Sequence, residues 1–312
     1  MDYEGQICRA PMERSSFMLP VMVGCSYNQC KFCNLFRHLK YRELPMEQIE
    51  AELKRVRELH GKPKKIFLGD GNAFGLKTEK LYEILDLIAY YFPECEGINM
   101  DATVTSILHK RQEELEMLAR KKVKHLYLGI ESGLDDVLKF MKKDHDLAQA
   151  YQAIDRLHEA GLIYDAHIMT GVGGMENAEA LAQFLNRTNP AHVVNFSMFL
   201  HKEVPLYQDI RQGTFVPADE LETIREEYHL IERIAPEKAG ANILYDGFHD
   251  FIHVRVRGHL PGDKEKMLAK LNGIIQEYEG KEPVYSFVQG ECPDLEYCDD
   301  GKAVWDMDRK TS

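Results

Sequence analysis

The sequence predicts an α/β fold, in which a parallel sheet covered by helices curls into a partial (βα)6 barrel followed by a short α+β extension. Short apolar runs alternate with amphipathic helical segments six times before residue 204. The runs lie roughly 30–40 residues apart, as expected for strand–helix units. Most of the unusual residues directly follow an apolar run. Since parallel sheets bind ligands at the C-terminal ends of their strands, this placement predicts a functional site there.

The first two units lie within residues 20–91. The apolar run at 20–24 is the first expected strand, and it ends at Cys25. A helix is expected near 46–60, because Pro45 suits its first turn and Gly61 its end. The run at 65–69 is the second strand, it ends in the turn 70–72, and a helix over about 78–91 follows.

Four further strands complete the series. We expect strands at 97–101, 125–131, 164–171 and 192–199, with helices at 106–121, about 134–142, 147–160 and near 176–187. Their order in the chain predicts a right-handed series of crossovers, which can curl into an open barrel.

The pattern changes after residue 200. A long helix is expected at about 218–235, an alternating strand at 249–257, and a last helix with Asp263 as its N-cap. We therefore expect a core of residues 1–204, a C-terminal extension of residues 205–285 and an acidic tail of residues 286–312.

Composition limits the classes of function. The 312 residues contain 39 basic and 51 acidic side chains, a net charge of −12, which argues against a nucleic-acid partner. No apolar run approaches the ~20 residues that span a bilayer, and the N-terminus has no apolar signal region, so we expect a cytoplasmic protein with no membrane partner. An odd count of seven cysteines indicates metal binding or catalysis rather than a disulfide framework.

Three of these cysteines form the most informative motif. Cys25, Cys30 and Cys33 are spaced Cys-x4-Cys-x2-Cys on the loop after the first strand. Three thiolates can ligate three irons of a [4Fe–4S] cluster and leave the fourth iron open to another ligand. The alternative is a zinc clip of these cysteines with His38 in a non-catalytic binding protein. Ordinary buried thiols are a third interpretation.

The loop and the strand–helix series together resemble the radical S-adenosylmethionine (SAM) enzymes over about residues 15–210. The usual family spacing is Cys-x3-Cys-x2-Cys. The longer first gap and the aromatic Phe32 resemble the branch of oxygen-independent coproporphyrinogen III oxidase and the elongator-type catalytic subunit. The resemblance implies a partial TIM-like barrel that binds a [4Fe–4S] cluster and SAM, with flavodoxin or ferredoxin as electron donor. It implies that SAM is cleaved to methionine and a 5′-deoxyadenosyl radical, which abstracts hydrogen from a substrate.

The resemblance also implies which residues hold SAM. Gly69, Asp70 and Gly71 match the glycine-rich turn that contacts the SAM ammonium, although Asp-Gly is also a common plain turn. Glu131 and Ser132 match the end of the fourth strand, where a carboxylate meets ribose hydroxyls or the ammonium and where Ser132 could instead cap a helix.

Four further positions carry weaker matches. Lys143 matches a basic residue that contacts the SAM carboxylate, or is a solvated lysine at a helix end. His167 stands where the branch has an acidic residue near adenosine, and could be a core histidine. Val172 belongs to the loop 171–174 that resembles the adenine-packing segment. Asp101 ends the third strand, where its side chain either faces the site or points away from it.

The substrate is not identified by the sequence. We take it to be a small molecule, with candidate contacts from His201, Tyr207, His249, His253, Arg255 and Arg257. A tRNA-modifying enzyme of the same chemistry is the alternative. Cys292 and Cys298 could contribute to a second cluster, but two cysteines are too few to complete one.

Overall fold

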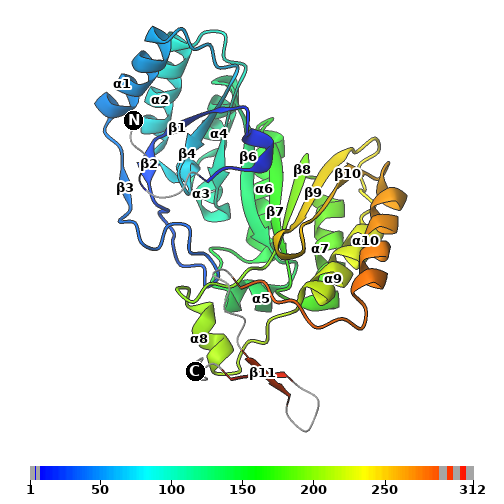
Figure 1. Ribbon diagram of the computed structural model, residues 1–312. Helices are drawn as coiled ribbons and strands as arrows, with labels where there is room; N and C mark the ends of the chain where they lie inside the picture. Colours follow the sequence, from blue (N-terminus) through cyan, green and yellow to red (C-terminus); the bar gives the residue numbers. More distant parts are fainter. Residues whose placement is uncertain (1–3, 5–7, 288–293, 298–302, 307–312) are drawn as a thin grey trace.

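The computed structural model describes residues 4, 8–287, 294–297 and 303–306. Its centre is an eight-stranded sheet in the order β1-β4-β5-β6-β7-β8-β9-β10, with helices packed along it (Figure 1). The first seven strands are parallel and β10 is antiparallel to β9. Within the described residues β1 and β10 do not pair, so the sheet is an open α/β barrel. The strands are β1 (Phe17–Pro20), β4 (Lys65–Gly69), β5 (Gly97–Ala102), β6 (Val123–Glu131), β7 (Ile163–Thr170), β8 (His192–Ser197), β9 (Ile243–His249) and β10 (Val254–Leu260).

Helices follow the strands as the apolar periodicity predicts. In α6, for example, Asp146 accepts a hydrogen bond from the Gln149 amide at 2.8 Å, and buried Ala150, Ile154 and Leu157 face the sheet. The helices are α1 (Met46–Glu58), α2 (Thr78–Tyr91), α3 (Val104–Leu108), α4 (Gln112–Arg120), α5 (Asp135–Phe140), α6 (Leu147–Glu159), α7 (Gly174–Thr188), α8 (Leu206–Arg211), α9 (Glu220–Arg233) and α10 (Lys264–Tyr278). None of the described helices is long and apolar enough to cross a membrane.

The helix expected at 106–121 is wrong in detail, since two helices, α3 and α4, occupy this stretch. The helix is interrupted at Lys110 and Arg111. The Arg111 amide donates to the Glu114 carboxylate at 2.6 Å and a new helix starts there, so this side-chain cap overrides the continuous apolar pattern.

The first strand also differs from the expectation. The run at 20–24 contributes only its first residue to β1, and the two-residue strand β2 (Met22–Val23) pairs with β3 (Arg42–Glu43). This short ladder closes the base of the loop that carries the three cysteines. Gly24, with φ of 80°, turns the chain from β2 into that loop.

The single strand expected at 249–257 is wrong, because the chain reverses within it. A 3₁₀ turn at Asp250–Ile252 and His253, whose φ is 55°, connect β9 to β10 as a hairpin. The sequence analysis missed β9, which joins β8 in parallel and lengthens the sheet by a seventh parallel strand. Two further strands, β11 (Asp294–Tyr297) and β12 (Ala303–Asp306), pair with each other.

Candidate functional site

The three cysteines lie on the loop between β2 and β3, at the edge of the sheet where the parallel strands end (Figure 1). Each has a free thiol and is partly exposed. Three thiolates on one loop can hold either a metal cluster or a single metal ion.

An arginine that the sequence analysis did not single out shapes this loop. Arg37 donates from Nε to the Cys33 carbonyl at 2.7 Å and from Nη2 to the Cys30 carbonyl. Both cysteines are thus held through their backbones by one guanidinium, which does not contact their sulfur atoms. An arginine four residues after the last cysteine was the only trace of this in the sequence.

Contacts from segments that follow later strands of the sheet also anchor the loop. The Lys31 amide donates to the Met141 carbonyl at 3.0 Å, and the Lys31 ammonium pairs with Asp209 at 2.9 Å. The Tyr27 hydroxyl donates to the Lys142 carbonyl at 2.6 Å. The loop after β2 is therefore fixed to the segments that follow β6 and β8.

Burial raises the pKa of two cysteine thiols in this loop. It raises the pKa of Cys30 to about 11 and also raises the pKa of Cys33, and the neighbouring thiolates add to both effects. Cys8 belongs to this neighbourhood, since burial, Asp101 and Cys33 all raise its pKa. Grouped thiolates of this kind require a cation to hold them ionised, and iron ions would supply that charge.

The turn after β4 packs directly on the cysteine loop. A Cβ placed on Gly71, whose φ is 47°, would lie 2.5 Å from the Gly24 carbonyl oxygen and 2.7 Å from the Cys25 Cα. Only a glycine lets the two backbones approach this closely. Gly69 is buried at the end of β4. The turn is thus packed against the first cysteine.

Two carboxyl groups lie side by side at the ends of β4 and β5. Asp70 is 5% exposed and its Oδ1 has no hydrogen-bond partner. Burial raises the pKa of Asp70 to about 6, while burial and the charge of Asp70 raise that of Asp101 to about 8. An unpartnered buried oxygen next to the cysteine loop fits a cationic ligand group such as an ammonium.

Glu131 and Lys143 form the ion pair of the site. The Lys143 Nζ lies 3.2 Å from the Glu131 Oε1, and the two side chains are 7% and 13% exposed. Burial alone would lower the pKa of Lys143, but the charges of Cys30 and Glu131 hold it above its ordinary value. Glu131 adopts a φ of 62° at a bulge between β6 and β7. A left-handed glutamate at a strand end is strained, and such strain is common at binding sites.

Gly129 leaves room for the Glu131–Lys143 ion pair because it has no side chain. A Cβ on Gly129 would meet the Glu131 Oε1 at 2.5 Å and the Lys143 Nζ at 2.9 Å. Lys143 also lies 5.9 Å from the centre of the Phe32 ring, next to the last cysteine. The ion pair therefore reaches toward the cysteine loop, and the solvated-lysine alternative is excluded by the burial of Lys143.

Ser132 takes a different direction from Glu131. Its hydroxyl is fully buried, donates to the Asn177 Oδ1 at 2.7 Å and accepts from the Leu134 amide at 3.1 Å. The cap residue of α5 is Leu134. Ser132 thus holds the turn after β6 against α7, and its hydroxyl both donates and accepts a hydrogen bond within the protein.

His167 and Val172 line the interior side of the site. The His167 Nε2 is buried without a hydrogen-bond partner, and burial and the charge of Lys143 lower the pKa of His167 to about 4. Val172 packs in an apolar cluster with Met141, Met198 and Phe32. The loop of Val172 is held by Glu226, which accepts from the Gly171 amide at 2.8 Å. Glu226 was not among the expected residues.

The substrate candidates do not share one place. His201 contacts the loop residue Asn34 at 2.9 Å, and Tyr207 packs against the apolar cluster around Val172. His249 is fully buried between Glu220 and Glu227, so it cannot meet a substrate. Arg255 and Arg257 pair with Asp246 on β9, and His253 lies in the β9–β10 turn. Cys292 and Cys298 lie outside the described residues.

Two cavities lie near these groups. One of about 380 Å³ opens beside the cysteine loop and is lined by hydroxyl, amide and cationic side chains, including Ser26, Asn72, Thr103 and Lys110. The other, of about 430 Å³, lies between β10 and α10 and is lined by Arg255, Val256, Arg257, Lys266, Met267 and Lys270.

Comparison with known proteins gives a family match. The radical SAM superfamily matches residues 19–187, which contain the cysteine loop, the turn after β4, Glu131, Lys143, His167 and Val172.

Curated relatives are distant. The chain is 27% identical over 208 residues to the hopanoid C-2 methylase of Rhodopseudomonas palustris, and 28% identical over 176 residues to a tRNA-2-methylthio-N(6)-dimethylallyladenosine synthase of Alkalilimnicola ehrlichii. These matches cover 64% and 54% of the chain but only 39% of each relative. An uncharacterized Methanocaldococcus jannaschii protein, MJ0486, is 23% identical over 88% of both chains.

Solved structures agree on the fold. The archaeal Elp3 of Methanocaldococcus infernus aligns over 91% of this chain and 70% of its own, with a TM-score of 0.53 and 15% identity. TsrM of Kitasatospora setae, a radical SAM methyltransferase determined with cobalamin and a [4Fe–4S] cluster bound, aligns over 64% of this chain and 39% of its own, with a TM-score of 0.52 and 14% identity.

Proposed function

The chain belongs to the radical SAM superfamily, whose enzymes use a [4Fe–4S] cluster and SAM, and from this premise we propose that Cys25, Cys30 and Cys33 are the cluster ligands. The observation that carries the proposal is the packing of the Gly71 turn on Cys25, beside the Glu131–Lys143 pair. Three thiolates leave one iron open for the amino and carboxylate groups of SAM. We propose residues 1–204 as the core that holds these cofactors and residues 205–285 as its extension.

The neighbouring side chains would each take one part of SAM. The buried Asp70 oxygen and the backbone of Gly69 and Gly71 suit the ammonium, with Asp101 behind them. Lys143 suits the carboxylate and Glu131 the ribose hydroxyls. Neutral His167 and the apolar group of Phe32 and Val172 suit the adenosine, whereas Ser132 shapes the turn that carries Glu131.

The bound cofactors would supply reductive cleavage of SAM to a 5′-deoxyadenosyl radical that removes hydrogen from a substrate. The protein contributes position and a dry environment. Arg37 fixes the cysteine backbones, and the apolar cluster around Val172 keeps water from the adenosine side. The substrate would reach this place past His201 and Tyr207, and an electron donor such as flavodoxin or ferredoxin would reduce the cluster. Free, partly exposed thiols suit a reducing compartment such as the cytoplasm.

The proposal is tested by anaerobic reconstitution with iron and sulfide. We expect the native protein to bind the cluster and form 5′-deoxyadenosine from SAM when reduced. Cys30→Ala should lose near-stoichiometric iron and sulfide and the SAM cleavage, with its melting temperature almost unchanged, because Cys30 belongs to neither large apolar cluster. Cys95→Ala, which removes a buried thiol outside the loop, should keep both. A Cys30→Ala protein that retains its iron would refute the ligand assignment.

A second candidate is modification of tRNA by the same chemistry. One relative is named as a tRNA-2-methylthio-N(6)-dimethylallyladenosine synthase, and four cationic side chains line the cavity between β10 and α10. Such a groove suits phosphate groups even in an acidic protein. SAM turnover that rises on addition of tRNA, and falls back in Arg257→Ala with Lys266→Ala, would favour this candidate. Turnover indifferent to tRNA would favour a small substrate.

A further inference from the structure

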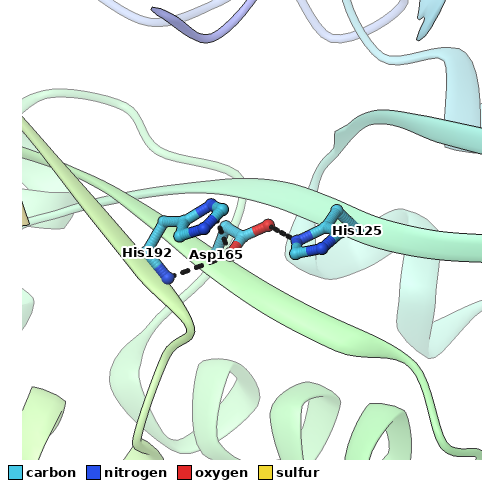
Figure 2. Close-up of side chains that lie close together, drawn as sticks. All are labelled: His125, Asp165 and His192. Atoms are coloured by element: carbon cyan, nitrogen blue, oxygen red, sulfur yellow. Dashed lines mark hydrogen bonds and ion pairs between the residues drawn. The ribbon is translucent and has the colours of Figure 1, made fainter. Parts of the chain in front are cut away.

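Two histidines and an aspartate meet at the end of the sheet opposite the cysteine loop. His125 lies near the start of β6, Asp165 near the start of β7 and His192 at the start of β8 (Figure 2). His125 and Glu131 are six residues apart on one strand, which corresponds to roughly 20 Å. The group is therefore separate from the proposed SAM site.

Their ligand atoms converge. The His125 Nδ1 lies 2.6 Å from the Asp165 Oδ2, and the His192 Nδ1 lies 3.3 Å from the Asp165 Oδ1. One ligand atom from each residue falls within 4.8 Å of the others. The His192 backbone amide donates to the Asp165 Oδ1 at 3.0 Å and fixes the carboxylate between the two rings, as Figure 2 shows. The rings are 9° from parallel, with centres 5.2 Å apart.

The protein satisfies the Asp165 carboxylate but leaves one histidine nitrogen of the group without a hydrogen-bond partner. Asp165 is fully buried, and in the described part of the chain its ion-pair partners are the two imidazoles. The His192 Nδ1 is buried and has no hydrogen-bond partner. A positive charge beside the buried carboxylate would give this ring nitrogen a partner and offset the charge of the carboxylate.

A divalent cation would supply that charge. Two imidazoles and one carboxylate are the nitrogen and oxygen donors that borderline transition-metal ions prefer. Around a tetrahedral zinc ion with bonds of about 2.0–2.1 Å, ligand atoms lie about 3.3 Å apart. The His192 Nδ1–Asp165 Oδ1 separation of 3.3 Å matches this value, whereas the His125 Nδ1, now 2.6 Å from the Asp165 Oδ2, would move away from that oxygen to bind the ion. Both histidine side chains are 21% exposed, which gives an ion a path from solvent and leaves room for water ligands.

We propose that His125, Asp165 and His192 bind one divalent transition-metal ion, with Zn²⁺ as the expected ion and water completing its coordination. The site ties together the starts of three neighbouring strands. It is independent of the iron–sulfur cluster and of SAM, so it stands or falls separately from the proposed function.

The test uses the reconstituted, cluster-containing protein, dialysed anaerobically against Zn²⁺. Zinc and iron per chain are measured by mass spectrometry, and the zinc ligands by X-ray absorption. We expect about one zinc per chain with nitrogen and oxygen neighbours at about 2.0–2.1 Å and no sulfur. His125→Ala and His192→Ala should each weaken zinc binding at least tenfold and leave iron unchanged. His259→Ala, at an exposed position on β10, is the matched control.

Three results would overturn the proposal. The first is a zinc content no higher than the background. The second is bound zinc with sulfur neighbours at about 2.3 Å, which would place the ion on the cysteines. The third is equal zinc content in the native protein and the histidine variants. Circular dichroism of each variant checks its folding. If a variant does not fold, the ligand shell of zinc in the native protein still decides the question.

Discussion

At the scale of single residues, the Glu131–Lys143 pair places two buried charges next to the cysteine loop. Both side chains are largely buried, next to the cysteine loop, and Glu131 holds a left-handed backbone conformation. A buried ion pair contributes little net stability, because desolvation of the two charges offsets their attraction. Its position beside Cys30 fits binding of a zwitterion such as the methionine part of SAM better than a structural role.

Removing the lysine charge tests that interpretation. We expect Lys143→Met to raise the KM for SAM at least tenfold, because a charged hydrogen bond to the carboxylate is lost. Iron content should stay the same, since the lysine is not a metal ligand. The exposed Lys139→Met on α5 is the control and should behave as the native protein. An unchanged KM in Lys143→Met would mean that the lysine only balances Glu131.

The residue scale also shows what the sequence could predict. The spacing of the cysteines and the place of Glu131 after an apolar run were visible in the sequence, because both depend on local order. Arg37, Gly129 and Glu226 were not visible, because each acts through a contact made only after folding. His249 was assigned to the substrate side, yet two glutamates from α9 enclose it.

At the scale of elements, the turn after β4 and the cysteine loop act as one unit. We expect Gly71→Ala to separate them, because its Cβ meets backbone atoms at 2.5 and 2.7 Å that cannot rotate away. The variant should lose cluster iron several times faster to a chelator. Gly161→Ala is the matched control, with φ of 76° but no atom within 4 Å of the added Cβ.

Both variants should lose about 1 kcal/mol of stability from the strained backbone. The rate of iron release, measured by absorbance, should distinguish the two variants. Equal release rates in the two variants would contradict the close packing of the turn on Cys25.

Helix α9 places a second ionic group beneath the sheet. His249 lies 3.0 Å from the Glu220 Oε2 and 2.9 Å from the Glu227 Oε2. Burial opposes the imidazolium, but Glu227 and Glu220 raise the pKa of His249 from 6.5 to about 9. Because the folded-state pKa is raised, the stabilisation is fully present below pH 6.5 and is lost as the pH rises through 9.

We therefore expect the free energy of unfolding to fall by about 2–3 kcal/mol between pH 7 and pH 10. Denaturant titrations at several pH values measure it. Glu220→Gln should flatten the dependence, because it removes one of the charges that hold the proton. Glu279→Gln, at an exposed ion pair with Arg225, should leave it unchanged. A native protein equally stable at both pH values would contradict the charged imidazolium.

The errors at this scale have local causes. The hydrogen bond from the Arg111 amide to the Glu114 carboxylate divides a predicted helix, and the left-handed His253 divides a predicted strand. Hydrophobic periodicity does not record such points, because a cap and a turn depend on one or two polar residues. The missed β9 followed from the same hairpin, since its last residue had been assigned to the wrong strand.

At the scale of the whole molecule, the parallel arrangement of seven strands brings the residues of the site together. Residues that follow β2, β4, β5, β6 and β7 in the sequence are brought to one edge, although nearly 150 residues separate Cys25 from Val172. Because parallel strands all end at the same edge, the alternation of apolar runs and helices was enough to predict this gathering. It was not enough to predict the extension, where β10 reverses direction and closes the series.

The central claim is that three cysteines leave one iron open and that SAM binds it. The most direct measurement is electron–nuclear double resonance of the reduced cluster with SAM carrying a ¹⁵N-labelled amino group. The account predicts a ¹⁵N coupling that appears with SAM, is absent in Cys30→Ala and weakens in Lys143→Met. A reduced cluster whose spectrum does not respond to SAM, or a protein that takes up zinc at the three cysteines instead of iron, would contradict it.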